Sequence, residues 1–315
     1  MKKSASLDIA SVKSYSKMTT KFNMVENILG GWWKIPMMIV KGAPGPCIGI
    51  TAALHGNELN GLSIIQALWE SIKPEKLVGT IVLIPVLNIP GFLNGTREFS
   101  DGQDLNRVMP GDPNGTPSEV YANAIMKKLI PQFDFLIDLH TASFGRVNSL
   151  YVKATMSNPV IKKIALLQNP EIIVNNSGPK GSLRYQTEKL NKPAITVEIG
   201  NPNIFQKKYI TQSLRGLTNV LSSLGFIKTK VYEQKQEPII CKSSAWLYAK
   251  HAGILTVYPG LTDQVKKGDV IGRLTDIYGE CIVDIKAPYD AVVVGKSTNP
   301  VCEVGARVVH LGKVE

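Results

Sequence analysis

The 315-residue sequence has few cysteines and histidines, and it has no long hydrophobic run. Its four cysteines are far apart and form no Cys-x-x-Cys pair, which excludes a zinc ribbon or a thioredoxin-like redox motif and gives no sign of a disulfide framework. No apolar run reaches the roughly 18 residues that a transmembrane helix needs. The first residues carry lysines without an apolar stretch behind them, so we expect a cytoplasmic protein without a secretory signal or a membrane partner.

The net charge is +11, because 36 lysines and arginines outnumber 25 aspartates and glutamates. Surfaces that bind nucleic acid concentrate basic residues in a stripe with interleaved aromatic residues. Here the basic residues are dispersed in pairs along the chain, for example at 127–128 and 266–267. We therefore expect a small-molecule partner and no nucleic acid: the dispersed charge fits a surface that attracts a small anionic substrate, or it serves solubility alone. The sequence leaves homo-oligomerisation open.

Apolar runs alternate with segments of helical periodicity as far as residue 224. This pattern predicts an α/β fold with a mixed, mostly parallel central sheet flanked by helices. Residues 1–23 are expected to form an extended or frayed lead-in, and Gly42–Pro46 a turn. Strands are predicted at 32–41, 47–54, 80–87, 133–141, 149–154 and 193–200, and helices at 58–71, 117–129, 159–168, 182–190 and 203–224.

The composition changes after Gly225, where a polar stretch is followed by short β segments separated by glycines and turns. This change predicts a catalytic domain at residues 1–235 and a separate, small all-β domain at 236–315. The β domain resembles the half-barrels of biotinyl and lipoyl carrier domains. The hairpin that carries the modified lysine in those carriers has no lysine here, so we expect no covalently attached cofactor. The domain is expected to cover the active site or to mediate oligomerisation.

Histidines follow two of the predicted strands. His55 directly follows strand 47–54, Glu58 stands in the first turn of the next helix, and His140 lies at the end of strand 133–141. Each residue alone is weak evidence, because a His-x-x-Glu pair arises often by chance. The carboxyl ends of parallel strands meet at one edge of a sheet, however, and two imidazoles with one carboxylate are the protein ligands of a catalytic zinc whose fourth position is open to water. The sequence therefore predicts one zinc per chain.

A further carboxylate, Glu198, lies within an apolar strand, where an unpaired carboxylate is costly to bury. It is the candidate general base that activates the zinc-bound water and returns the proton to the leaving amine. Arg107 is a candidate for two-pronged hydrogen bonding to a substrate carboxylate, and Asn106 for a further polar contact. Asp138, two residues before His140, is expected to orient a metal ligand without binding the metal itself.

Four motifs in this order are similar to those of the succinylglutamate desuccinylase/aspartoacylase family, which belongs to the wider zinc carboxypeptidase-like fold. The motifs are Leu54–Gly61, Asp104–Arg107, Asp138–His140 and Val197–Gly200. The resemblance covers the chain from about residue 25 to its C-terminus.

The resemblance implies a role for each candidate residue. It implies that His55, Glu58 and His140 bind zinc, that Glu198 is the general base and acid, and that Asn106 and Arg107 contact the substrate. It also implies that Arg97 polarises the scissile carbonyl and that Arg184 contacts a substrate carboxylate.

The expected function is zinc-dependent hydrolysis of the amide bond of an N-acylated amino acid or a related small amine. Two alternatives stay open: a zinc carboxypeptidase acting on a peptide C-terminus, and a non-catalytic zinc-containing binding protein. A β domain over the active site favours a small substrate, and Glu198 favours catalysis because metal binding alone does not need it. No motif defines the acyl group.

Overall fold

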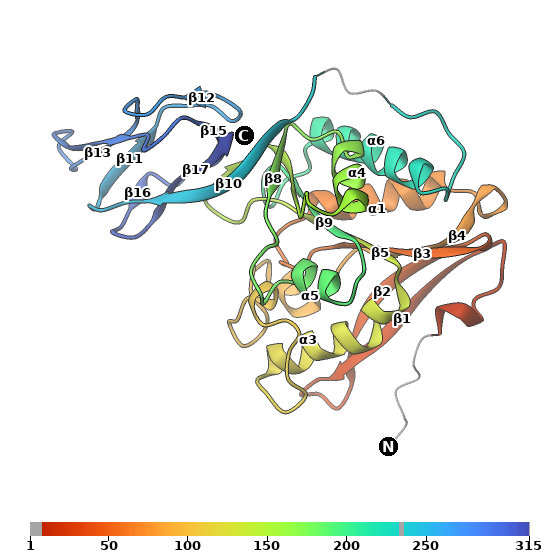
Figure 1. Ribbon diagram of the computed structural model, residues 1–315. Helices are drawn as coiled ribbons and strands as arrows, with labels where there is room; N and C mark the ends of the chain where they lie inside the picture. The colour runs from red at the N-terminus through yellow and green to blue at the C-terminus, as the bar shows by residue number, and fades with distance from the viewer. Residues whose placement is uncertain (1–7, 233–235, 315) are drawn as a thin grey trace.

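A mixed sheet of 13 strands crosses the molecule in the computed structural model, which describes residues 8–232 and 236–314 (Figure 1). The first eight strands in spatial order are β1 (Ser16–Glu26), β2 (Trp32–Lys41), β4 (Val78–Ile84), β3 (Ala43–Ala52), β5 (Phe135–His140), β9 (Ala194–Ile199), β7 (Leu150–Ala154) and β8 (Ile172–Asn175). Strand β3 pairs in parallel with β4 and β5, and β5 pairs in parallel with β9. The prediction of a mixed, mostly parallel central sheet is confirmed for these eight strands, in which four of the seven ladders are parallel.

Helices cover both faces of this part of the sheet (Figure 1). One face packs against α1 (Asn60–Ser71), α4 (Pro159–Leu167) and α6 (Lys207–Ser223), and the other against α3 (Pro117–Lys128) and α5 (Leu183–Lys189). Two separate clusters of buried apolar side chains fill the two interfaces, which explains why the central strands read as continuous apolar runs. None of the described helices is long and apolar enough to cross a membrane.

The strand register places polar side chains in one row across the sheet. In the paired strands His140 lies opposite Glu198, and Glu198 lies opposite Tyr151 on β7. Paired residues point to the same face, and successive residues alternate between faces. Because Leu139 and Val197 belong to the cluster under α1, α4 and α6, the polar row faces the side of α3 and α5.

Two N-terminal segments differ from the expectation. The expected lead-in contains the edge strand β1, in which only Phe22 and Met24 are buried, so most of its sequence lacks the strong alternation of a half-buried strand. The expected turn at Gly42–Pro46 lies inside β3 from Ala43 onward, and it coincides with a shift of the pairing register between Ala43 and Cys47. Proline and glycine are tolerated there because this end of the strand is irregular.

Other segments were not predicted. The loop after β4 contains α2 (Ile89–Asn94) and the 3₁₀ turn η3 (Leu105–Arg107), and β8 was missed because its four residues are too few to show a period.

The C-terminal region is built of strands alone over residues 236–314, as predicted. Strands β10 (Ile239–Tyr248), β17 (Arg307–Val314), β15 (Ala291–Ser297) and β12 (Gln264–Val265) continue the large sheet, and β6 (Arg146–Asn148) pairs with β15. The second sheet has the order β14 (Cys281–Lys286), β13 (Val270–Thr275), β11 (Gly253–Val257) and β16 (Val301–Cys302).

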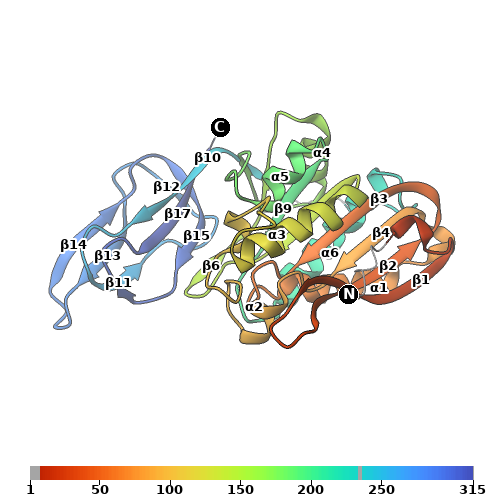
Figure 2. The ribbon, with the colours of Figure 1, turned by 90° about the horizontal axis from the view of Figure 1, so that it is seen from below.

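The C-terminal strands are joined to the rest of the fold by hydrogen-bonded ladders, although they lie to one side of it (Figure 2). Strand β10 pairs in parallel with β8, and β15 pairs with β6. The expectation of a separate β unit is therefore too simple, because one of its two sheets is an extension of the central sheet. The short strands β6 and β8, which the sequence did not reveal, provide the free edges.

Close packing of α1 on the sheet generates a testable prediction. A Cβ atom on Gly61 would lie 2.8 Å from the Cβ atoms of both Ala52 and Leu139. We expect Gly61→Val to lower the free energy of unfolding by about 1–3 kcal/mol, because the helix cannot approach as closely. Gln66→Val, at an exposed position of the same helix, should change it by no more than about 0.5 kcal/mol. Equal effects of the two variants in urea unfolding would contradict this account.

Candidate metal centre and active site

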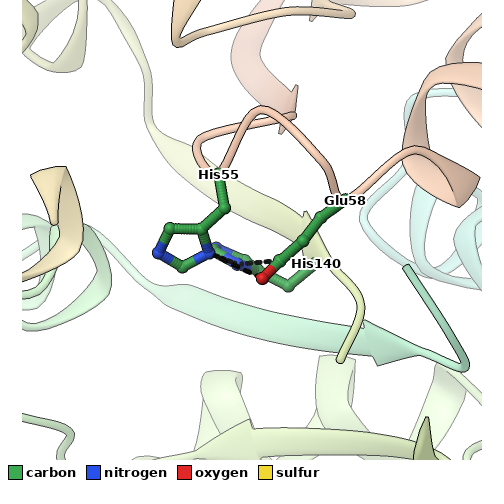
Figure 3. A group of neighbouring side chains, drawn as sticks. All are labelled: His55, Glu58 and His140. Atoms are coloured by element: carbon green, nitrogen blue, oxygen red, sulfur yellow. Dashed lines mark hydrogen bonds and ion pairs between the residues drawn. The ribbon is translucent and has the colours of Figure 1, made fainter. Parts of the chain in front are cut away.

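The three predicted metal ligands lie together, buried, at the carboxyl ends of β3 and β5 (Figure 3). His140 is the last residue of β5, whereas His55 and Glu58 lie in the connection from β3 to α1. This connection turns tightly, and the Glu58 amide donates to the His55 carbonyl at 3.1 Å. Helix α1 begins only at Asn60, so the expected position of Glu58 in its first turn is wrong: the turn comes before the helix.

The potential ligand atoms of these residues converge. Nδ1 of His55 lies 2.9 Å from Oε1 of Glu58, and Nδ1 of His140 lies 2.8 Å from Oε2. The two Nδ1 atoms are 3.1 Å apart. All three side chains are at most 3% exposed, so water does not separate these polar atoms.

Each histidine contacts an aspartate through its other ring nitrogen, Nε2. Nε2 of His140 lies 2.7 Å from Oδ2 of Asp138, and Nε2 of His55 lies 3.0 Å from Oδ1 of Asp104. The contact predicted for Asp138 is present, whereas the sequence analysis gave Asp104 no such role. Its place in the motif with Asn106 and Arg107 was the available signal.

These aspartates determine which nitrogen of each imidazole carries the hydrogen. An ionised carboxylate only accepts hydrogen bonds, so each Nε2 carries the hydrogen. In the neutral imidazoles both Nδ1 atoms then direct lone pairs towards each other and towards Glu58. Three such acceptors are unfavourable side by side in a buried site unless a proton or a cation lies between them. Two imidazoles and one carboxylate fit a divalent metal, and they are a ligand set of catalytic zinc.

The pKa shifts agree with this crowding. Burial alone would raise the pKa of the Glu58 carboxyl, but His55 and His140 outweigh burial and hold it well below its usual range. Burial alone would lower the pKa of His140, but Asp138 and Glu58 raise it well above its usual value. The raised pKa of His140 favours a proton on its ring when no cation is bound, and a metal ion would have to displace that proton.

Glu198 lies beside the three ligands because the β5–β9 ladder pairs it with His140. Its carboxylate accepts hydrogen bonds from Nζ of Lys153 at 2.6 Å and from Nδ2 of Asn148 at 3.3 Å. These two donors orient a carboxylate that is only 6% exposed. The sequence analysis missed both donors, since they come from β7 and β6, about 50 residues earlier in the chain.

Comparison with known proteins places the chain in a family. Residues 44–224, more than half of the chain, match the sequence profile of the succinylglutamate desuccinylase/aspartoacylase catalytic domain. The chain belongs to the succinylglutamate desuccinylase/aspartoacylase family. The family expected from the four motifs is thus confirmed.

Proteins similar to this chain match it over nearly its whole length. An N-alpha-acetyl-L-2,4-diaminobutyric acid deacetylase of Halomonas elongata is 24% identical over 89% of this chain and 86% of its own. The product-bound ectoine utilization protein EutE (DoeB) of Ruegeria pomeroyi shares the fold with a TM-score of 0.86, 22% identity and coverage of 94% and 95%. A succinylglutamate desuccinylase/aspartoacylase from Rhodobacter sphaeroides has a TM-score of 0.87, 21% identity and 98% coverage of both chains.

In this family member Arg97 lies next to the candidate metal ligands. Its Nη1 donates to Oε1 of Glu58 at 3.0 Å, and its Nη2 donates to Oδ2 of Asp104 at 2.8 Å. It also donates to the hydroxyl of Ser143. Burial alone would lower the pKa of Arg97, but the two carboxylates outweigh it and raise the pKa. The guanidinium is thus a fixed positive charge at the edge of the centre.

The remaining predicted residues line one pocket together with the candidate metal ligands, but they differ in how far their side chains are available to a ligand. Arg107 is exposed, and its Nη1 donates to the Asn106 carbonyl at 2.8 Å. The Asn106 side-chain carbonyl accepts from the backbone at the start of α5, which leaves its amide group available. Arg184 is buried and forms an ion pair with Glu188 at 2.8 Å. Arg107 is therefore open to a ligand, and Arg184 already has a partner.

C-terminal residues complete the wall of this pocket, which has a volume of about 270 Å³. Trp246 comes from β10, and Arg307 and His310 come from β17. The His310 ring stacks on Trp246 with centroids 5.1 Å apart, and burial followed by the charges of Lys153 and Arg307 lowers its pKa to about 3. His310 is therefore neutral at pH 7. The sequence gave no signal for these residues, because their position depends on the docking of β10 on β8.

The contacts of Asp104 and Asp138 with the two histidines lead to a prediction about metal affinity. We expect Asp138→Asn to weaken zinc binding by about 10- to 100-fold, because His140 loses the charged partner that orients its ring and increases its basicity. Competition with a chromophoric chelator measures the affinity. Asp284→Asn, which breaks only the surface ion pair with Arg273, is the control and should leave the affinity unchanged. Equal zinc affinity of wild type and Asp138→Asn would contradict the assigned role.

Proposed function

We propose that this chain is a zinc-dependent deacylase that hydrolyses the amide bond of an N-acyl amino acid, with N-acetyl as the first acyl group to test. The observation that carries the proposal is the buried group of His55, Glu58 and His140 with Glu198 paired directly beside it. Membership of the family and the deacetylase activity named for the Halomonas elongata relative support it.

The metal site suits zinc by its donor chemistry. The three side chains offer nitrogen and oxygen ligands, with no cysteine among them. A zinc ion held there by His55, Glu58 and His140, one per chain, would polarise the scissile carbonyl and lower the pKa of the attacking water. Asp104 and Asp138 would keep both imidazoles in the tautomer that binds metal.

Glu198 is assigned the proton transfers. It accepts a proton from the attacking water and returns it to the nitrogen of the leaving amine. Hydrogen bonds from Lys153 and Asn148 hold the Glu198 carboxylate in place beside His140. This role requires Glu198 near the metal without being a ligand.

Three arginines and an asparagine are assigned to the substrate. Arg97, already beside Glu58, stabilises the negative charge that develops on the carbonyl oxygen. Arg107 and the free amide of Asn106 bind the substrate carboxylate. Arg184, which forms an ion pair with Glu188, is also assigned a direct contact with the substrate carboxylate.

The shape of the pocket favours the deacylase over the two alternatives. A volume of about 270 Å³, with Trp246 and His310 in the pocket wall, suits an N-acyl amino acid better than the end of a peptide chain. A binding protein without catalysis would not need a carboxylate placed beside the ligands. A carboxypeptidase remains the second candidate because it would use the same chemistry.

Replacing the assigned base tests the proposal. We expect Glu198→Gln to lower kcat for N-acetyl amino acids by about 10²- to 10⁴-fold, because proton transfer from water is lost. Its zinc content, measured by elemental analysis, should equal that of the wild type, and Glu303→Gln at an exposed position should keep full activity. An active Glu198→Gln variant would contradict the mechanism. Faster cleavage of short peptides than of acyl amino acids would favour the carboxypeptidase.

A further inference from the structure

Both oxygens of the Glu198 carboxylate accept hydrogen bonds from donors that are neither candidate metal ligands nor assigned to the substrate. Oε1 accepts from Nζ of Lys153 at 2.6 Å, and Oε2 accepts from Nδ2 of Asn148 at 3.3 Å. Within residues 8–232 and 236–314, the side chain of Glu198 accepts from these two donors alone. Lys153 and Asn148 therefore determine the direction in which this buried carboxylate points.

The ammonium group of Lys153 also contacts an aromatic ring. Lys153 and Tyr151 are two residues apart on β7, so their side chains leave the strand on the same face. Nζ of Lys153 lies 5.4 Å from the Tyr151 ring centroid, which is a cation–π distance. The ladder between β7 and β9 pairs Tyr151 with Glu198. The ring and the carboxylate thus fix the same ammonium group.

Asn148 is fixed by the C-terminal strands. It is buried on β6, and the ladder between β6 and β15 pairs it with Gly295 (Figure 2). A Cβ atom on residue 295 would lie 2.4 Å from Oδ1 of Asn148, so a larger residue there would displace this side chain. The C-terminal strands therefore reach Glu198 through the amide group of Asn148.

Glu198 lies beside the candidate metal ligands, and its carboxylate is itself a potential ligand. It is paired with His140 in the ladder between β5 and β9, and it lines the same pocket as His55, Glu58 and His140. A zinc site with four protein ligands is closed, whereas a catalytic site has three and leaves the fourth position to water. A carboxylate without other partners is attracted to a divalent cation by its charge.

The two hydrogen bonds are suited to keep Glu198 apart from the ligand set. The potential ligand atoms of His55, Glu58 and His140 lie within 4.8 Å of one another, and Glu198 is outside this group. The ammonium of Lys153 compensates the carboxylate charge and so weakens its attraction to a cation. A carboxylate has about four lone-pair positions, so two hydrogen bonds leave others free to accept a proton from water.

We propose that Lys153 and Asn148 are positioning residues that prevent Glu198 from becoming a fourth ligand of the metal and thereby keep one position open to water. This inference rests on the proposed function and deepens it, because the base has to lie next to the metal and outside its ligand set. Without the two donors, Glu198 binds the metal, the metal is held more tightly and turnover falls.

Zinc affinity tests the proposal without an assay of turnover. Lys153→Met removes the charged donor, and Lys153→Met/Asn148→Leu removes both donors. We expect the double variant to bind zinc at least about tenfold more tightly than the wild type in competition with a chelator, because a carboxylate replaces water. The gain should disappear when Glu198→Gln is added, since an amide is a weaker zinc ligand. Equal or weaker binding by the double variant, or a gain that persists without Glu198, would overturn the proposal.

Azide binding to the cobalt-substituted protein tests whether the fourth position is open. Azide is a small anion that binds metals, and the visible spectrum of cobalt changes with its ligands. We expect azide to change the spectrum of the wild type and to leave that of the double variant unchanged. The matched control is Lys208→Met, because Lys208 also lies over a tyrosine ring and pairs with a carboxylate, Glu171, outside this pocket. It should respond to azide like the wild type. A double variant that responds equally would contradict the inference.

Turnover separates this inference from the proposed function. We expect the double variant to hydrolyse N-acetyl amino acids with a kcat about 10- to 100-fold below that of the wild type. If the wild type binds zinc but hydrolyses no acyl amino acid, the proposed function fails, and the affinity and azide measurements still decide the role of Lys153 and Asn148. If the wild type is active and the double variant has unchanged zinc affinity, the proposed function stands and the inference fails.

Discussion

Three lone pairs that face one another in a buried space are the constraint on which the site depends. Asp104 and Asp138 each accept a hydrogen bond from Nε2 of one imidazole, so His55 and His140 direct their Nδ1 atoms at Glu58 within about 3 Å. Such a group is unfavourable unless a positive charge lies inside it. Two imidazoles and one carboxylate placed in this way are a candidate cation site, and Arg97 contributes a positive charge at its edge.

The sheet supplies the geometry that this constraint needs. The register of β5, β9 and β7 aligns His140, Glu198 and Tyr151 in one row, and a shift of one residue would turn all of these side chains to the opposite face. The C-terminal strands extend the same sheet and bring Trp246 and Arg307 to the pocket. A single hydrogen-bonded network thus positions the candidate metal ligands, the proposed base and the C-terminal wall of the pocket.

Local patterns explain what the sequence could predict. His55 and His140 end apolar runs, and Glu198 interrupts one, so strand periodicity alone placed them at one edge of the sheet. The sequence could not predict the partners of these residues, because Lys153 and Arg307 meet the site only through pairing between strands remote in the chain. The weakly alternating β1 and the short β6 and β8 were missed because edge and short strands carry little periodic signal, and β6 and β8 are what join the C-terminal strands to the sheet.

The central claim is that His55, Glu58 and His140 hold one zinc ion through nitrogen and oxygen alone. X-ray absorption spectroscopy at the zinc edge, on protein with its zinc content measured per chain, tests it most directly. The account predicts one zinc per chain with ligands at about 2.0–2.2 Å, two imidazoles among them and no sulfur. A sulfur ligand at about 2.3 Å, or a chain that binds no zinc, would contradict it.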